Sequence, residues 1–176
     1  MGYAGGTTAD PTYRRIGDHA ETVQVDFDPS VVTYPDLLAL FWTSHRPLTP
    51  APSRQYASFV FTRDDGQQEH AEASLEDMRR RFGRVYTEVT SLVRFYPAED
   101  YHQKYRLRAD RVLMAEMGAV YAEPQAFRES TAAARLNGYL DGWGTGTDLA
   151  GEIASFGLSA DAQEYLRQRV VAVSGG

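Results

Sequence analysis

The spacing of apolar residues changes along the chain, and this change restricts the fold more than any other feature. Up to Pro97, runs in which apolar and polar residues alternate are separated by stretches with helical spacing. Beyond Leu107, every apolar stripe has helical spacing. Alternation is the period of a strand, whereas steps of three and four residues give one face of a helix. The pattern predicts helices packed on a sheet, in an α/β or α+β arrangement, over residues 1–106 and a helical extension over residues 107–176.

Three segments of the first part are predicted to be strands. Residues 22–28 alternate valine or phenylalanine with polar residues, and residues 56–61 are rich in aromatic and branched side chains. Residues 87–97 give the third segment. Each segment ends at a proline or a polar run, as is typical of strands.

Helices are expected between these strands. Thr33 suits an N-cap, and Pro35 and Asp36 suit the first turn of a helix that ends before residue 47. A longer helix follows, with an apolar stripe at Ala71, Leu75, Met78 and Phe82. In the extension, helices are expected over residues 111–121, 124–140 and 160–173. Residues 141–147 are rich in glycine and are expected to form a loop.

Charge and composition exclude several classes of protein. With 18 basic and 24 acidic side chains the net charge is -6, so we expect no phosphate-binding surface and no nucleic-acid partner. The one basic run, residues 79–84, stands where a helix is expected to end, and cations there complement the helix dipole. The longest apolar run, residues 37–42, is far below the roughly 20 residues of a membrane span. With no secretory signal pattern at the start, we expect a cytoplasmic protein without a membrane segment.

Cysteine is absent from the sequence, which leaves histidines, carboxylates and tyrosines for chemistry. His19 and Glu21 stand two residues apart, so both point to one side if the chain is extended there. A metal would need a third ligand such as His102, and no close ligand spacing supplies it. An acid/base hydrolase built on the same pair has no motif behind it. We therefore expect no metal and no cofactor.

Tyrosines offer a second set of groups. The sequence has 11 of them, and Tyr3, Tyr56, Tyr101 and Tyr105 stand in loops or at element ends beside polar residues. Burial raises the pKa of a carboxyl group so that it can donate a proton, while neutral phenols donate hydrogen bonds. The alternative is that these tyrosines only border the core.

Five segments, taken in order, resemble one known family. They are GYAGG at residues 2–6, PTY at 11–13, DHAETVQVDFDP at 18–29, RQYASFVF at 54–61 and FYPAEDYHQKY at 95–105. Their order and spacing resemble the peptide-methionine (S)-S-oxide reductases, the methionine sulfoxide reductase A family. The resemblance implies an α+β fold, with helices packed on a mixed β-sheet as a two-layer sandwich. It also implies thiol-dependent reduction of methionine S-sulfoxide, a repair of oxidative damage.

The same resemblance implies roles for individual residues. Glu21, in the His-Ala-Glu segment, matches the acid that protonates or hydrogen-bonds the sulfoxide oxygen. Tyr3 and Tyr56 match the hydroxyl donors that position this oxygen. Further residues expected to shape the substrate pocket are Asp100, Tyr101 and His102. The expected substrates are methionine-sulfoxide-containing proteins or free methionine sulfoxide.

The sequence departs from this family at the nucleophile. In the family, a cysteine in a Gly-Cys-Phe-Trp segment precedes the glycine-rich turn, and here the sequence begins at that turn. Reducing a sulfoxide requires a soft nucleophile that accepts the oxygen as a sulfenic acid and is regenerated by another thiol. These 176 residues alone are therefore expected to be inactive.

Two explanations of this departure remain open. One hypothesis is that the reading frame starts further upstream and encodes a cysteine-bearing segment. In that case a thioredoxin-like protein is the expected reductant. The alternative is an inactive homologue that binds methionine or methionine sulfoxide without turnover.

Overall fold

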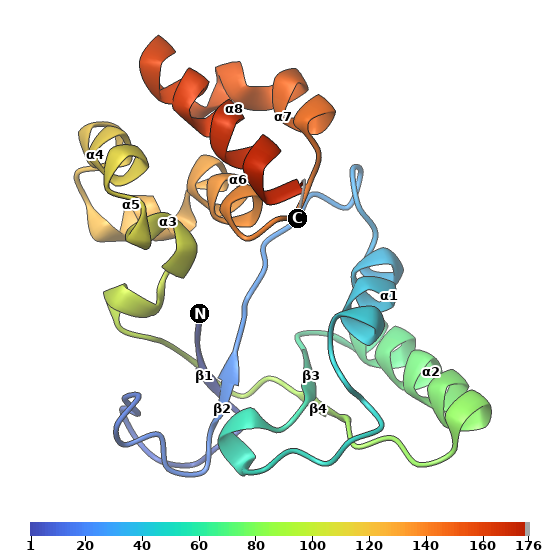
Figure 1. The fold of residues 1–176 in the computed structure, drawn as a ribbon. Coiled ribbons are helices and arrows are strands. Elements are labelled where there is room, and N and C mark those ends of the chain that lie inside the picture. The colour runs from blue at the N-terminus through green and yellow to red at the C-terminus, as the bar shows by residue number, and fades with distance from the viewer. Residues whose placement is uncertain (175–176) are drawn as a thin grey trace. The chain divides into compact units, whose positions relative to one another are not determined.

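The computed structural model describes residues 1–174 and, in residues 172–174, the backbone alone. The chain divides into two compact units, Met1–Glu99 and Asp100–Gly176, whose elements are labelled in Figure 1. Every strand of the described residues belongs to the first unit, and the second is helical. The architecture agrees with the α+β class. The sequence-based boundary after residue 106 falls inside helix α3 (Tyr105–Ala109).

Three short strands of the first unit form an antiparallel sheet. Their order is β2 (Ala20–Thr22), β1 (Gly2–Ala4) and β5 (Phe95–Pro97). In this register Tyr3 lies opposite Glu21 on one neighbour and opposite Tyr96 on the other. Residues directly opposite each other in antiparallel strands point to the same face of the sheet. The register therefore collects these three side chains in one row.

A parallel pair of strands forms a second sheet in the same unit. Its elements are β3 (Phe59–Thr62), the crossover helix α2 (Asp65–Phe82) and β4 (Glu88–Ser91). Parallel strands require such a long crossover. Helix α1 (Tyr34–Ser44) packs beside α2, as Figure 1 shows. The small core between these elements consists of Leu38, Val60 and Ala71.

The ends of α1 and α2 follow from local sequence. Thr33 caps α1 and exchanges hydrogen bonds with Asp36 in a capping box, which confirms the predicted start. Asp64 caps α2 by accepting a backbone hydrogen bond. Helix α2 ends at Phe82, with the arginines at 79–81 in its last turn and Gly83, whose φ is 79°, as its C-cap. The basic run therefore terminates a helix, as predicted.

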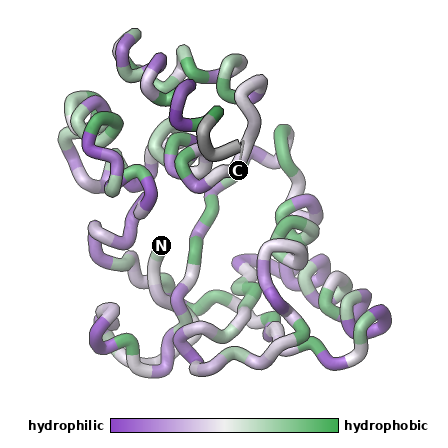
Figure 2. The backbone as a smooth tube through the Cα atoms, viewed as in Figure 1, coloured by the Kyte–Doolittle hydropathy of each residue, from purple (hydrophilic) through white to green (hydrophobic). Residues whose placement is uncertain are grey.

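The second unit consists of short helices around one apolar core. Its elements are η2 (Asp100–His102), α3, α4 (Arg111–Val120), α5 (Pro124–Glu129), α6 (Thr131–Leu140), α7 (Gly146–Glu152), η3 (Ile153–Phe156) and α8 (Ala160–Ser174). Leu113, Met117, Leu136 and Leu166 are fully buried in this core. Figure 2 shows hydrophobic and hydrophilic residues interspersed along these helices, as expected when each buries one side. Among the described residues, no helix has the length and hydropathy to cross a membrane.

The prediction of a strand over residues 22–28 is wrong beyond Thr22. Strand β2 ends there, and Figure 1 shows the following residues as an extended segment without a paired neighbour. Val23 and Val25 are 63% and 59% exposed. Alternation shows that one face of this segment suits burial, but a strand also needs a partner for its backbone, and β1 pairs with β2 only through Gly2–Ala4.

Two other predicted elements are divided in the structure. Residues 87–97 form β4 and β5, which belong to different sheets. Residues 124–140 form α5 and α6, because Ser130 between them adopts ψ 124° and caps α6 with its side chain. The predicted strand at residues 56–61 begins at Phe59, after the turn η1 (Arg54–Tyr56).

In the extension, two helix predictions hold and one loop prediction is partly wrong. The helices predicted over residues 111–121 and 160–173 are α4 and α8; the side chain of Val173, assigned to the apolar face, lies outside the described residues. Helix α7 begins inside the predicted glycine-rich loop. Thr145 and Asp148 form a capping box there, which sets the start of α7.

Candidate functional site

The candidate site is built on the row formed by Glu21, Tyr3 and Tyr96 in the antiparallel sheet. Tyr3 is 1% exposed, and its hydroxyl donates to Oε2 of Glu99 at 2.7 Å. The other oxygen of Glu99 accepts the backbone N–H of Tyr13 at 3.0 Å. Glu99 thus links the glycine-rich turn segment to the end of β5. Sequence reasoning missed Glu99, although it stands directly before the predicted Asp100.

Glu21 is half-buried and has one carboxylate oxygen engaged. The side-chain amide of Gln55 in η1 donates to Oε1 of Glu21 at 2.6 Å. Within residues 1–174, Oε2 of Glu21 accepts no hydrogen bond. Glu21 therefore has one oxygen held in position by Gln55 and a second oxygen available to a ligand.

Tyr56, also in η1, lies close to this carboxylate. Its side chain is exposed, and a hydrogen bond with Tyr13 raises the pKa of Tyr56 above its ordinary value, with smaller contributions from desolvation and from the charge of Glu21. The phenol has a single O–H group, so donation to a ligand would replace its hydrogen bond with Tyr13. Glu21 and Tyr56, which the sequence proposes as acid and donor, are therefore electrostatic neighbours.

His19 has a structural place beside the site. It is 1% exposed; its Nδ1 accepts the N–H of Gly6 at 3.1 Å, and its Nε2 lies 2.8 Å from the carbonyl oxygen of Thr8. Both ring nitrogens are occupied by backbone groups, so His19 is not available to a metal or to a substrate proton. Among the described residues, no group of three His, Cys, Asp or Glu side chains could hold a metal ion.

The glycine-rich turn packs closely against His19 and has a backbone conformation that requires glycine. Gly5 has a φ of 78°, a conformation that favours glycine. A Cβ at Gly6 would stand 2.7 Å from the backbone nitrogen of His19, so a larger residue would push the turn off the histidine. Arg54 of η1 adds hydrogen bonds to the carbonyl oxygens of Gly5 and Asp18, at 3.3 and 3.4 Å. The turn and η1 are thereby held against each other.

Asp18 closes the same loop with four hydrogen bonds. Its two oxygens accept from the backbone N–H and the hydroxyl of Thr7 and of Thr8, at 2.8 to 3.0 Å. These bonds, the backbone N–H of Thr7 first among them, hold the pKa of Asp18 well below its ordinary value. The charged form of Asp18 is therefore the form that stabilises the loop.

Replacing Asp18 should change how stability depends on pH. Because the folded pKa lies below the unfolded value of 3.8, the contribution of Asp18 is complete above the unfolded pKa and is lost as pH falls towards the folded pKa. Asp18→Asn is therefore expected to lower the free energy of unfolding at pH 7 and to lower it progressively less below about pH 4. Urea unfolding of both proteins at a series of pH values measures this. Asp10→Asn, in the same loop, is the control, and a difference that stays constant at low pH contradicts the expectation.

The remaining predicted site residues lie in the second unit. Asp100, Tyr101 and His102 form η2, with the Tyr101 and His102 rings 4.3 Å apart. The carbonyl oxygen of Asp100 accepts the N–H of Gln103, which closes this turn. Their role in a substrate pocket stays a prediction.

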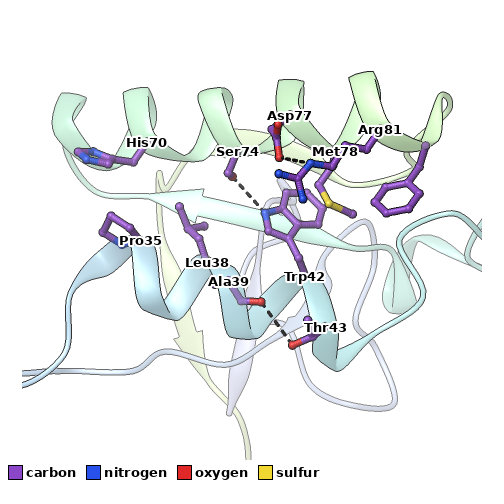
Figure 3. A pocket seen from close by; sticks show the side chains of 11 residues that line it. Pro35, Leu38, Ala39, Trp42, Thr43, His70, Ser74, Asp77, Met78 and Arg81 are labelled. Carbon is purple, nitrogen blue, oxygen red and sulfur yellow. Dashed lines mark hydrogen bonds and ion pairs between the residues drawn. The ribbon is translucent and has the colours of Figure 1, made fainter.

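A groove of about 470 Å³ lies between α1 and α2 (Figure 3). Trp42 of α1 points towards α2 and donates its Nε1–H to Ser74 at 3.1 Å. Leu38, Met78 and Phe82 make much of the lining apolar. None of the residues of the sheet row lines this groove. The groove is lined largely by apolar side chains, whereas the sheet row carries a carboxylic acid and two phenols.

Fold and site together define an α+β protein that can present a carboxylic acid and a phenol to one polar ligand atom. A family model described as peptide methionine sulfoxide reductase matches residues 1–133. The chain belongs to the peptide methionine sulfoxide reductase family, which confirms the resemblance seen in the sequence motifs.

Relatives and a solved structure agree with this membership. A peptide methionine sulfoxide reductase of Drosophila melanogaster is 41% identical over 168 residues, covering 94% of this chain and 67% of that protein. Peptide methionine sulfoxide reductase A5 of Oryza sativa subsp. japonica is 38% identical over 146 residues, covering 79% of this chain and 57% of that protein. The crystal structure of Mxr1 from Saccharomyces cerevisiae in reduced form has a TM-score of 0.52 at 28% identity, covering 59% of this chain and 66% of that chain. The chain thus spans 57 to 67% of the length of these relatives.

Proposed function

We propose that this chain supplies the oxygen-binding part of a methionine sulfoxide reductase site. The observation that carries the proposal is the oxygen of Glu21 that Gln55 leaves free, with the phenol of Tyr56 near enough to interact with the charge of Glu21. A sulfoxide oxygen is a strong hydrogen-bond acceptor, and a protonated carboxyl group and a phenol are both donors. Tyr3 donates to Glu99 in this structure, so it supports the site by holding Glu99.

Reduction of a sulfoxide also requires a source of two electrons. A sulfoxide becomes a sulfide when it gains two electrons and two protons, and its oxygen leaves as water. Two thiols supply the electrons and become a disulfide. The 176 residues contain no cysteine, so in this proposal the thiols come from outside them. A thioredoxin-like protein of the cytoplasm remains the predicted reductant.

A second candidate is a binding protein without turnover, and the absence of cysteine favours it. Both candidates share the oxygen-binding role of Glu21. They differ in whether a thiol is delivered to the bound sulfoxide. Binding and reduction must therefore be measured separately.

Glu21→Gln is expected to weaken binding of a peptide containing methionine S-sulfoxide by about 10- to 100-fold, the loss typical of a hydrogen bond to an ionisable group. Isothermal titration calorimetry measures the affinity. A glutamine keeps the size of the side chain but cannot protonate the oxygen. The R-sulfoxide peptide is expected to bind more weakly than the S form, because the acid and the phenol have fixed positions.

Glu72→Gln is a closely matched control. Glu72 also accepts a glutamine amide, from Gln68 at 2.5 Å, but it lies on the exposed side of α2. This variant should bind the peptide like the unsubstituted chain. Failure of the unsubstituted chain to bind either epimer contradicts the proposal. Binding without formation of methionine in the presence of dithiothreitol supports it, since the chain has no thiol of its own.

A further inference from the structure

The two groups proposed to bind a sulfoxide oxygen are held in different ways. Gln55 donates to Oε1 of Glu21 at 2.6 Å, so this contact leaves Oε2 of the carboxylate to a ligand. Tyr56 has a single O–H group, and the hydrogen bond with Tyr13 engages the phenol there. A ligand that accepts from Tyr56 must therefore displace Tyr13, whereas binding at Glu21 leaves the Gln55 contact intact.

The direction of the bond between the two tyrosines follows from its effect. The bond raises the pKa of Tyr56, so it stabilises the protonated form of this phenol. A hydrogen bond stabilises the protonated form of a phenol when that phenol is the donor. Tyr56 therefore donates to the oxygen of Tyr13, and the hydrogen that it gives is the one that a sulfoxide oxygen would accept.

The backbone holds Tyr13 in position. The N–H of Arg15 donates to the carbonyl oxygen of Thr12 at 2.9 Å, and these two residues form a bridge that closes a tight turn around Tyr13. The N–H of Tyr13 donates to Oε1 of Glu99 at 3.0 Å. Because the backbone is already fixed, the bond between the side chains costs little conformational entropy and competes well with a ligand.

We propose that Tyr13 lowers the affinity of the site by occupying the hydroxyl group of Tyr56, an inference that rests on the function proposed above. Only molecules in which this bond is broken can donate from Tyr56 to a sulfoxide oxygen. The apparent affinity is the intrinsic affinity multiplied by the fraction of such molecules. For a hydrogen bond of ordinary net strength this fraction is about one third to one tenth. Tyr13, in the PTY segment at residues 11–13, thereby sets how tightly the site binds.

Removing one hydroxyl group should therefore tighten binding. Tyr13→Phe keeps the ring and is expected to bind a peptide containing methionine S-sulfoxide about 3- to 10-fold more tightly than the unsubstituted chain. In a Tyr56→Phe background the same substitution should change the affinity by less than about 2-fold, because the contested donor is absent. A structural role of Tyr13 would instead weaken binding in both backgrounds. Tyr86→Phe is the matched control, since the Tyr86 ring packs under Arg84 in the same unit, and it should leave the affinity unchanged.

Isothermal titration calorimetry measures these affinities. If the unsubstituted chain binds and Tyr13→Phe binds no more tightly, this inference alone is overturned. An equal gain from Tyr13→Phe in the Tyr56→Phe background overturns it as well. If neither the unsubstituted chain nor Tyr13→Phe binds either epimer, the function proposed above fails and this inference fails with it.

A second measurement tests the bond without any ligand. Nuclear magnetic resonance of the tyrosine side chains, with the Tyr56 signal assigned from Tyr56→Phe, follows the pKa of Tyr56. It should lie above the ordinary value of 10.0 in the unsubstituted chain and move back towards that value in Tyr13→Phe. A pKa of Tyr56 that is not raised in the unsubstituted chain overturns the inference. Tyr13 is 39% exposed, so the loss of its hydroxyl group should leave the fold intact, which circular dichroism verifies.

Discussion

His19→Ala is expected to lower the free energy of unfolding of the first unit by about 3 kcal/mol, since it removes two buried hydrogen bonds and leaves a cavity. The N–H of Gly6 and the carbonyl of Thr8 would lose their partners. The imidazole also packs against the Tyr96 ring in a T-shaped arrangement, with 5.4 Å between the ring centroids, and this contact would be lost. His19→Ala should therefore loosen the glycine-rich turn on which the site rests.

The two tryptophans allow this unit to be followed alone. Trp42 lies in the first unit and Trp143 in the second, so in a Trp143→Phe background the fluorescence reports the first unit. His70→Ala is the control, because His70 is exposed on α2, where its Nδ1 lies 2.7 Å from the carbonyl oxygen of Gly66 and its ring has a single 6.5 Å edge contact with Tyr34 among the described residues. We expect a change below about 0.5 kcal/mol for His70→Ala. Equal effects of the two histidine variants would contradict the structural role of His19.

Asp110→Ala should have a comparable effect on the second unit, about 3 kcal/mol. Oδ1 of Asp110 accepts the N–H groups of Val112 and Leu113 at 3.1 Å and so caps α4. Oδ2 accepts the hydroxyl of Tyr165 in α8 at 2.9 Å, a hydrogen bond that raises the pKa of Tyr165. One nearly buried carboxylate therefore both starts a helix and joins it to another.

Hydrogen exchange of the α4 and α8 amides measures the loss, which should appear in both helices together. Glu123→Ala is the matched control, because Glu123 is the N-cap residue of α5 and makes no side-chain capping bond. It should change stability by less than about 0.5 kcal/mol. Faster exchange in α4 alone would show that Asp110 acts only as a cap.

Local sequence predicted those elements whose ends are set by side chains a few residues away. The capping box of Thr33 and Asp36 and the glycine after the arginines of α2 lie within one or two helical turns of the groups they satisfy. The break at Ser130 had an equally local cause. It was missed because the apolar spacing continues across it. Periodicity reports which face is buried, not where the backbone leaves the helix.

Strand pairing could not be predicted in the same way. The alternation in residues 22–28 correctly indicates an extended segment, but pairing depends on another chain segment at a suitable distance. Similarly, Gln55 was not selected as a partner of Glu21, since the two are 34 positions apart. Glu99 was overlooked because its role comes from contacts with Tyr3 and Tyr13, 96 and 86 positions away.

The sequence by itself determined the family, the α+β class and the absence of a thiol among these residues. Each of these is a matter of residue identity and order. Only the tertiary structure decided that Gln55 holds Glu21, that Tyr3 donates to Glu99, and that the ring of His19 holds the glycine-rich turn. The reason is physical: a side chain's role depends on which donors and acceptors folding brings within about 3 Å of it.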